Sequence, residues 1–531
     1  MTTLLAATEP GELHRLPHND YSSLRPPPLG EWAPHLPVSV VTPAYGDQDK
    51  LDLTLASLAA QTYPSHLLEV VVVDDGTEPP LRLPEIAPAN TRIVTGASGG
   101  WGIAHAFHAG VLAAQGRIIQ RLDADMVVYR EHIEAQARWH HLASYLVVLG
   151  YKRFISYTTG EVSASEAYDA VSRGSADELF DLGQSLPHDW VERAIDQTDG
   201  LRAGGHLAFR AHVGATSSLT TRLYHEAGGM DISLTLGEDT ELGYRLAQTG
   251  AVFIPDNEAR SWHLGFSSMM RRQDDANRFN GPFLSNRLPQ PRRWRQGKAR
   301  QWLVPYIDVA IDAAGASYED VRTSAEGALN GSLPDVQVTL TGAWSALTEE
   351  RRSPLDDPQL DLRLLREAYR CEGRARLIDT LPKTSFPASF RFTCPAGWVP
   401  EPDALQRLVE FANKHGYGLV SLALAGTTEL TAARLERTAA FTRALRLRRA
   451  TEELDDVVDE TFGTHWLDGA EWGVVPAAET AGNDTDWQSE VARWQREARK
   501  WKGEAEQLQQ QLERRRLLLN PLRPLMRRRT R

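Results

Sequence analysis

The chain has 531 residues and a net charge of −12, which predicts two or three domains and excludes the basic footprint of a general nucleic-acid-binding protein. Its hydrophobic content of 42% is ordinary for a globular protein, and no apolar stretch has the length of a transmembrane helix. The cysteines, Cys371 and Cys394, are too few for a disulfide framework, and the N-terminus lacks the pattern of a signal peptide. We therefore expect a cytoplasmic protein.

Residues 1–36 are rich in proline and histidine, which predicts an extended arm that is packed on a domain surface or partly disordered. A strand follows at Val38–Val41, closed by Pro43, Ala44 and Tyr45, and a helix follows that strand. The run Glu69–Asp74 contains four consecutive valines, which indicates a strand buried on both faces, as in a parallel sheet. Strand, helix and strand within about forty residues predict a βαβ unit of an α/β protein.

Polar groups gather where these strands end. Asp75 follows the second strand, and a glycine-rich turn that includes Gly100 opens the next helix, so backbone can approach a ligand closely there. The chain has no P-loop motif and no dinucleotide fingerprint after its first strand, which disfavours P-loop enzymes and dehydrogenases.

Asp123 and Asp125 end a third buried strand. At positions i and i+2 of an extended strand their carboxylates point the same way, and a divalent cation such as Mg²⁺ or Mn²⁺ would relieve their repulsion. The competing interpretation is a solvated Asp-x-Asp at a strand end.

In order and spacing these segments resemble glycosyltransferase family 2, an inverting family with the GT-A fold, over residues 36–300. The resemblance implies that Asp75 contacts the uracil or ribose of a nucleotide sugar. It also implies that Asp123 and Asp125 form the metal motif that holds the diphosphate. The family usually has Ala-Arg-Asn after the glycine turn, whereas this chain has Ala106-Phe107-His108. His108 either replaces the missing basic contact or is simply packed.

A second acidic motif, Glu238-Asp239, stands at the start of a predicted helix. Asp239 there could be a helix cap, but by the same resemblance it is the general base, and Glu238 helps to place the acceptor. His263 lies where related enzymes carry a third metal ligand, although a lone histidine is more often structural. Trp190 and Trp262 are candidates for the acceptor side, with burial in the core as the alternative for Trp190.

From about residue 304 the strand pattern recurs without its acids. The segments Ile307–Ile311, Val336–Gly342 and Phe390–Val399 match the three earlier strands, which predicts an internal repeat. In this alignment Leu340 and Thr341 replace Asp74 and Asp75, and Cys394 and Ala396 replace Asp123 and Asp125. We expect a catalytic domain over 37–303 and a degenerate, inactive GT-A-like domain over 304–477. An unrelated α/β domain is the alternative.

Residues 478–531 are predicted to be a linker, a coiled coil and a basic tail. Apolar side chains alternate at steps of four and three over 487–512, which favours a seam between two or more chains over a docked single helix. The arginine-rich segment 514–531 either rests on the inner face of the cell membrane or is solvated.

Together these features favour an inverting, Mn²⁺- or Mg²⁺-dependent, hexosyltransferase-like enzyme. It would move a sugar from a nucleotide donor, UDP by resemblance, to a hydroxyl of a cell-surface polysaccharide or lipid-linked glycan. The rivals are a nucleotidyltransferase, whose basic glycine-rich first loop is missing here, and a non-catalytic glycan-binding scaffold.

Overall fold

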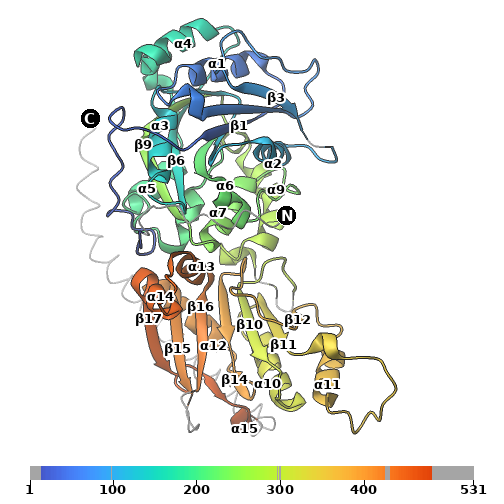
Figure 1. The fold of residues 1–531 in the computed structure, drawn as a ribbon. Helices are drawn as coiled ribbons and strands as arrows, with labels where there is room; N and C mark the ends of the chain where they lie inside the picture. Colours follow the sequence, from blue (N-terminus) through green and yellow to red (C-terminus); the bar gives the residue numbers. More distant parts are fainter. Residues whose placement is uncertain (1–13, 97, 296, 298–299, 425–430, 481–531) are drawn as a thin grey trace, which may run out of the picture. The chain divides into compact units, whose positions relative to one another are not determined.

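The computed structural model describes residues 14–96, 98–295, 297, 300–424 and 431–480. Residues up to Val474 form one compact unit, and a second unit begins at Val475. The first unit has two halves, each a β-sheet with its own α-helices (Figure 1). The predicted coiled coil over 487–512 and the basic tail lie outside the described residues. No helix in the described part of the chain is long and apolar enough to cross a membrane.

The first sheet has the strand order β3-β2-β1-β4-β8-β6-β9-β5, with β7 paired to β6. Its strands are β1 (Val38–Ala44), β2 (Leu68–Asp74), β3 (Thr91–Thr95), β4 (Ile118–Leu122), β5 (Met126–Val128), β6 (Leu146–Ile155), β7 (Leu186–Pro187), β8 (Thr216–Thr220) and β9 (Val252–Leu264). Its helices are α1 (Gln48–Ala59), α2 (Ile103–Ala113), α3 (His132–His140), α4 (Ala164–Arg173), α5 (Asp189–Gln197), α6 (Thr221–Glu226), α7 (Glu238–Gln248), α8 (Ser268–Arg271) and α9 (Gln273–Arg287). Strands β3, β2, β1 and β4 are parallel, so the predicted βαβ unit and the α/β class are confirmed.

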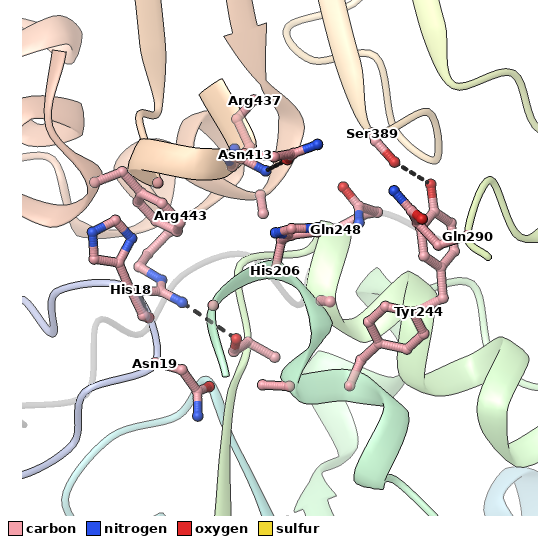
Figure 2. Close-up of a pocket in the computed structure, with 18 of the residues that line it drawn as sticks. His18, Asn19, His206, Tyr244, Gln248, Gln290, Ser389, Asn413, Arg437 and Arg443 are labelled. Atoms are coloured by element: carbon pink, nitrogen blue, oxygen red, sulfur yellow. Dashed lines mark hydrogen bonds between the residues drawn. The ribbon is translucent and has the colours of Figure 1, made fainter. Parts of the chain in front are cut away.

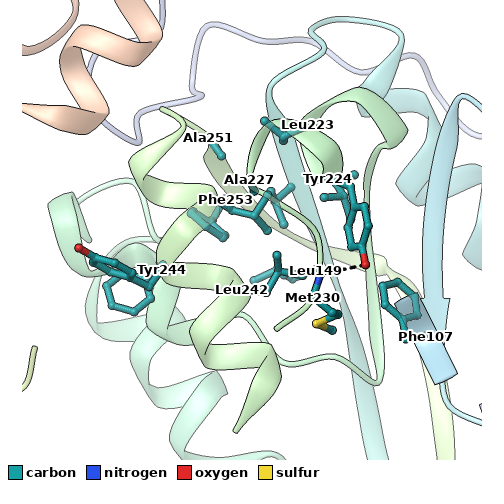
Figure 3. Close-up of a cluster of buried hydrophobic side chains, with 14 of the residues drawn as sticks. Phe107, Leu149, Leu223, Tyr224, Ala227, Met230, Leu242, Tyr244, Ala251 and Phe253 are labelled. Carbon is teal, nitrogen blue, oxygen red and sulfur yellow. Dashed lines mark hydrogen bonds between the residues drawn. The ribbon is translucent and has the colours of Figure 1, made fainter. Parts of the chain in front are cut away.

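The valines of β1 and β2 are buried on both faces of the sheet, as their sequence predicts. Helix α2 packs directly on these strands at Gly110, where a Cβ would lie 2.4 Å from Val41 Cγ1. The same buried cluster extends to α7, where it includes Leu242 and Tyr224 (Figure 3). The oxygen of Tyr224 accepts a hydrogen bond from the Met230 backbone N–H at 2.9 Å. This core fixes the position of α7, whose first turn carries the Glu-Asp pair.

The second sheet has the order β12-β11-β10-β13-β16-β15-β17. Its strands are β10 (Ile307–Asp312), β11 (Val336–Thr341), β12 (Ala375–Ile378), β13 (Phe390–Thr393), β15 (Leu419–Leu424), β16 (Thr431–Arg437) and β17 (Thr464–Asp468), and β14 (Trp398–Pro400) and β18 (Val474–Pro476) lie outside it. Its helices are α10 (Tyr318–Leu329), α11 (Leu360–Ala368), α12 (Ala404–His415), α13 (Thr438–Leu447) and α14 (Leu454–Phe462), and α15 (Ala477–Thr480) belongs to the second unit.

The two sheets share one topology. In each, four parallel strands come first, as β3-β2-β1-β4 and β12-β11-β10-β13. The next two pairings are antiparallel, and the pairing after them, β6 with β9 or β15 with β17, is parallel. The register also corresponds, because Val38 pairs with Leu68 and Ile118 just as Ile307 pairs with Val336 and Phe390. Repetition of both order and strand direction favours the internal-repeat interpretation over chance similarity.

The two halves of the compact unit are joined through α7 and α13. Tyr244 of α7 is buried, and its hydroxyl donates to the Pro387 carbonyl at 2.7 Å. Arg443 of α13 donates to the carbonyl of Gly250 at 2.8 Å and to that of Leu16 in the N-terminal arm at 3.0 Å. The arm is therefore packed in place where the structure describes it.

Candidate active site

The end of β2 and the glycine turn before α2 meet at Asp75. Its Oδ2 accepts a hydrogen bond from the Gly102 backbone N–H at 2.7 Å, and its own N–H donates to the Ala44 carbonyl at 2.9 Å. Tyr45 and Trp101, the sequence neighbours of Ala44 and Gly102, are 75% and 70% exposed. The structure thus brings together the segments that were predicted to bind a nucleotide, with Pro43 buried beneath them and Gly100 at the surface.

Asp123, Asp125 and His263 converge at one point, where ligand atoms of all three lie within 4.8 Å of one another. The two aspartates lie in the turn between β4 and β5, not on an extended strand as predicted. They converge because this turn folds back, and because β5 pairs with β9 so that Met126 stands opposite His263. His263 Nδ1 is 3.7 Å from Asp125 Oδ2.

This group of three side chains has the properties of a cation site. Asp123 Oδ1 and His263 Nδ1 are both buried without a hydrogen-bond partner. Burial raises the pKa of Asp125 and lowers the pKa of His263, so the histidine is held neutral, as a metal ligand must be. Two carboxylates and one imidazole suit Mn²⁺ or Mg²⁺, with Mn²⁺ favoured by the nitrogen ligand.

Glu238 and Asp239 occupy the first turn of α7, after Gly237 at a φ of 78°. Asp239 Oδ1 accepts from the Thr240 N–H at 2.6 Å, and Oδ2 accepts from the Gly214 N–H at 3.2 Å. Gly237 is the N-cap, so Asp239 is not the cap residue. Asp239 is half-buried, which leaves its carboxylate reachable by a substrate.

Arg121, whose role was not predicted from the sequence, contacts both acidic motifs. It precedes Asp123 in β4, is 4% exposed, and donates from Nη2 to Glu238 Oε1 at 3.1 Å. Its Nε lies 3.5 Å from Asp123 Oδ1. Burial, with Asp239 as a further cause, raises the pKa of Glu238 to about 7, and Arg121 opposes that rise. Glu238 is thus buried in direct contact with Arg121. A charged residue in an apolar strand was the signal available in the sequence.

Lys152 of β6 is a second group that the sequence analysis missed. It is 5% exposed, and burial lowers the pKa of its ammonium to about 8, against the opposing effect of Asp123 and Asp239. The available signal was again a charged side chain in an apolar strand.

The two tryptophans predicted to lie on the acceptor side differ in exposure. Trp190 is 45% exposed, so it does not belong to the core and keeps a surface that a sugar can stack on. Trp262 has 0% exposure, and its indole N–H donates to the Ala176 carbonyl at 2.7 Å. A side chain without exposed surface cannot stack on a sugar, so Trp262 is corrected to a core residue.

His108 is packed. Its Nδ1 lies 2.8 Å from the hydroxyl of Tyr224, and burial lowers its pKa. This arrangement favours the packed interpretation over a basic contact to the donor.

The second sheet carries no acids at the corresponding strand ends. When the two sheets are aligned by their strand register, Gly342 and Ala343 stand at the positions of Asp74 and Asp75. In the same alignment, Pro395 and Gly397 stand at the positions of Asp123 and Asp125. The sequence alignment to Leu340, Thr341, Cys394 and Ala396 is therefore shifted by one or two residues, because it lacked the strand register. Either alignment removes every carboxylate.

A cavity of about 80 Å³ lies where the arm, the first sheet's helices and the second sheet's helices meet (Figure 2). It is lined by side chains that include His18, His206, Gln248 and Arg437. Its volume is well below the roughly 300–1,000 Å³ of a typical ligand site, so it does not suit a nucleotide sugar. None of the residues predicted to bind a nucleotide or a metal lines this cavity.

Comparison with known proteins identifies a family for part of the chain. Residues 39–207 match the model described as glycosyl transferase family 2, so the predicted resemblance is confirmed over that segment. No curated protein matches the chain. The match supports a glycosyltransferase as the class of protein, and the two sheets are consistent with GT-A-like domains.

Three solved structures are similar at low identity. The mannosyltransferase PcManGT from Pyrobaculum calidifontis in complex with GDP-Man and Mn²⁺ is 17% identical over 50% of this chain and 65% of its own, with a TM-score of 0.29. GalNAc-T7 with UDP, GalNAc and Mn²⁺ is 16% identical over 44% of each chain, with a TM-score of 0.31. S. aureus TarS 1–349 in complex with UDP-GlcNAc is 14% identical over 49% of this chain and 70% of its own, with a TM-score of 0.33. This chain thus spans less than two thirds of the first two structures.

Proposed function

We propose that this protein is an inverting, divalent-metal-dependent glycosyltransferase that uses a UDP-sugar. Its acceptor would be a hydroxyl of a cell-surface polysaccharide or lipid-linked glycan. The observation that carries the proposal is the convergence of Asp123, Asp125 and His263 beside the Glu238-Asp239 pair, with Arg121 between the two groups.

The donor would lie across the strand ends of the first sheet. Asp75 is held by Gly102 at the nucleoside end, and Tyr45 and Trp101 offer exposed rings beside it. Asp123, Asp125 and His263 would hold the metal ion, which, when bound, would neutralise charge on the leaving diphosphate. The buried atoms Asp123 Oδ1 and His263 Nδ1, which have no hydrogen-bond partner, support that role.

Asp239 would act as the general base. Backbone N–H groups of Gly214 and Thr240 donate to its two oxygens and so fix the direction of its carboxylate. As the acceptor oxygen bonds to the anomeric carbon, Asp239 takes the hydroxyl proton, and the bond from that carbon to the diphosphate oxygen breaks. A single displacement of this kind inverts the anomeric centre.

The half over 304–477 would be an inactive partner domain that positions α7. It has no acids at the positions that correspond to Asp74, Asp75, Asp123 and Asp125. It nevertheless holds Tyr244 through the Pro387 carbonyl and the Ser389 hydroxyl. A non-catalytic scaffold needs none of the acids of the first half, and their convergence favours the enzyme.

The variant Asp239→Asn tests the proposal against the scaffold alternative. Release of free nucleotide from a panel of UDP-sugars with Mn²⁺ and glycan acceptors measures turnover, and calorimetry measures donor affinity. We expect turnover to fall by about 100-fold or more while donor affinity changes little, since a positioned base contributes about 10²–10⁴ in rate. Equal turnover in the wild type and the variant would contradict the assignment.

A further inference from the structure

Lys152 is a buried cation that has no anionic partner. In the described residues its ammonium forms no hydrogen bond and no ion pair, and its recorded contact is with the ring of Phe154, whose centroid lies 5.9 Å from Nζ. The residue is only 5% exposed. Burying an ammonium without a counter-charge is unfavourable, so this side chain reduces the stability of the folded protein.

The register of β6 and β9 places Lys152 beside the metal-binding group. Phe154 stands opposite His263 in this strand pair, and the two ring centroids are 4.8 Å apart. Lys152 and Phe154 are two residues apart on the same strand, so their side chains leave the same face of the sheet. Lys152 therefore lies on the face that carries His263.

The acidic groups of both motifs also act on Lys152. Asp123 and Asp239 are the carboxylates that most favour its charged form. Neither lies within ion-pair distance of Nζ among the described residues. The ammonium is thus within electrostatic reach of a carboxylate from each acidic motif, and among the described residues it has no ion-pair partner.

We propose that Lys152 binds an oxygen of the donor's diphosphate and stabilises it as the leaving group. The proposal rests on the proposed glycosyltransferase function. A lysine ammonium is a compact point charge that binds phosphate oxygens well. The contact would supply, from β6, the basic group that the helix after the glycine turn lacks, where His108 is packed against Tyr224.

The test compares Lys152→Met with the wild type in the full chain. Lys152→Arg keeps the charge, and Lys414→Met, which removes an exposed lysine of α12, is the matched control. Calorimetry with Mn²⁺ measures the affinity for UDP and for UMP, and for GDP and GMP. The second member of each pair lacks the β-phosphate.

We expect Lys152→Met to weaken binding of the diphosphate by about 10- to 100-fold, the usual effect of losing a charged hydrogen bond. Its affinity for the monophosphate should change by less than about threefold, and Lys414→Met should behave as the wild type. Lys152→Arg should retain most of the diphosphate affinity. Because an unpaired buried charge is removed, the Tm of Lys152→Met should equal or exceed that of the wild type.

Unchanged diphosphate affinity in Lys152→Met would overturn the inference and leave the glycosyltransferase proposal standing. Equal losses for diphosphate and monophosphate would also overturn it, since they would indicate a general disturbance. Failure of the wild type to bind any of the four nucleotides would instead contradict the proposed function. If Lys152→Met does not fold, Lys152→Gln against Lys152→Arg gives the same comparison.

Discussion

Arg121 Nη2 lies 3.1 Å from Glu238 Oε1, and this contact joins the strand that ends in the metal motif to the helix that begins with the Glu-Asp pair. Both side chains are buried, at 4% exposure each. One guanidinium therefore contacts a carboxylate of each acidic motif. The geometry explains why Glu238 is kept in the interior although it is half of an acidic pair.

Removing Arg121 should destabilise the protein and uncouple the motifs. Arg121→Met leaves Glu238 without its cation, and breaking a buried pair costs about 3–5 kcal/mol. A double-mutant cycle with Glu238→Gln, measured by urea unfolding, should give a coupling energy of about 1–3 kcal/mol. Additive effects would show that the two side chains do not interact.

Gly214→Ala should disturb the contact between Arg121 and Glu238 without a mutation at either residue. A Cβ at Gly214 would lie 2.0 Å from Arg121 Cζ, so the guanidinium must move away from Glu238. We expect destabilisation of about 1–3 kcal/mol, as for overpacking. Gly281→Ala in α9 is the control, because its Cβ would meet nothing within 4 Å. Equal unfolding midpoints for Gly214→Ala and the wild type would refute the close contact.

Buried histidines should make the fold sensitive to acid. Burial lowers the pKa of His140 to about 3 and that of His132 to about 4. A folded-state pKa below the unfolded value of about 6.5 means that the unfolded chain binds more protons, so stability falls as pH drops below 6.5. Each histidine should account for about 2 kcal/mol between pH 7 and pH 5.

The test is urea unfolding of His140→Gln at both pH values. The variant should lose less stability on acidification than the wild type, by about 2 kcal/mol. His66→Gln, which changes an exposed histidine, should keep the wild-type dependence. Identical pH profiles for His140→Gln and the wild type would mean that His140 does not titrate differently on unfolding.

Tyr244→Phe tests whether the second half supports α7. The variant removes a buried hydroxyl that bonds to the Pro387 carbonyl at 2.7 Å and lies 3.0 Å from the Ser389 hydroxyl. We expect a loss of about 1–3 kcal/mol, because a buried carbonyl is left without its donor. Tyr168→Phe, at a residue that is 37% exposed, should have little effect. A Tyr244→Phe variant as stable as the wild type would argue against this support.

Local patterns predicted the first half of the chain well. The valine runs gave β1 and β2, the glycine turn gave the start of α2, and the resemblance placed Asp123, Asp125 and His263 together. These features depend on neighbours in the sequence or on a known order of motifs. The fold class and the recurrence of the strand pattern were predictable for the same reason.

Contacts between distant strands were not predictable. The surroundings of Arg121 and Lys152 are set only when β4, β8, β6 and β9 form one sheet in that order, and nothing local in the sequence indicates their partners. The burial of Trp262 likewise follows from β9 lying inside the sheet. The shift from Cys394 to Pro395 as the counterpart of Asp123 needed the strand register.

Thermal unfolding of the full chain with nucleotide sugars, with and without Mn²⁺, tests the central claim most directly. A ligand at a hundred times its Kd adds about 2.7 kcal/mol to the free energy of unfolding. We predict that a UDP-sugar raises the Tm only when Mn²⁺ is present, and that Asp123→Ala abolishes the shift. A panel of UDP- and GDP-sugars that leaves the wild-type Tm unchanged in Mn²⁺ would contradict a working donor site and favour the scaffold.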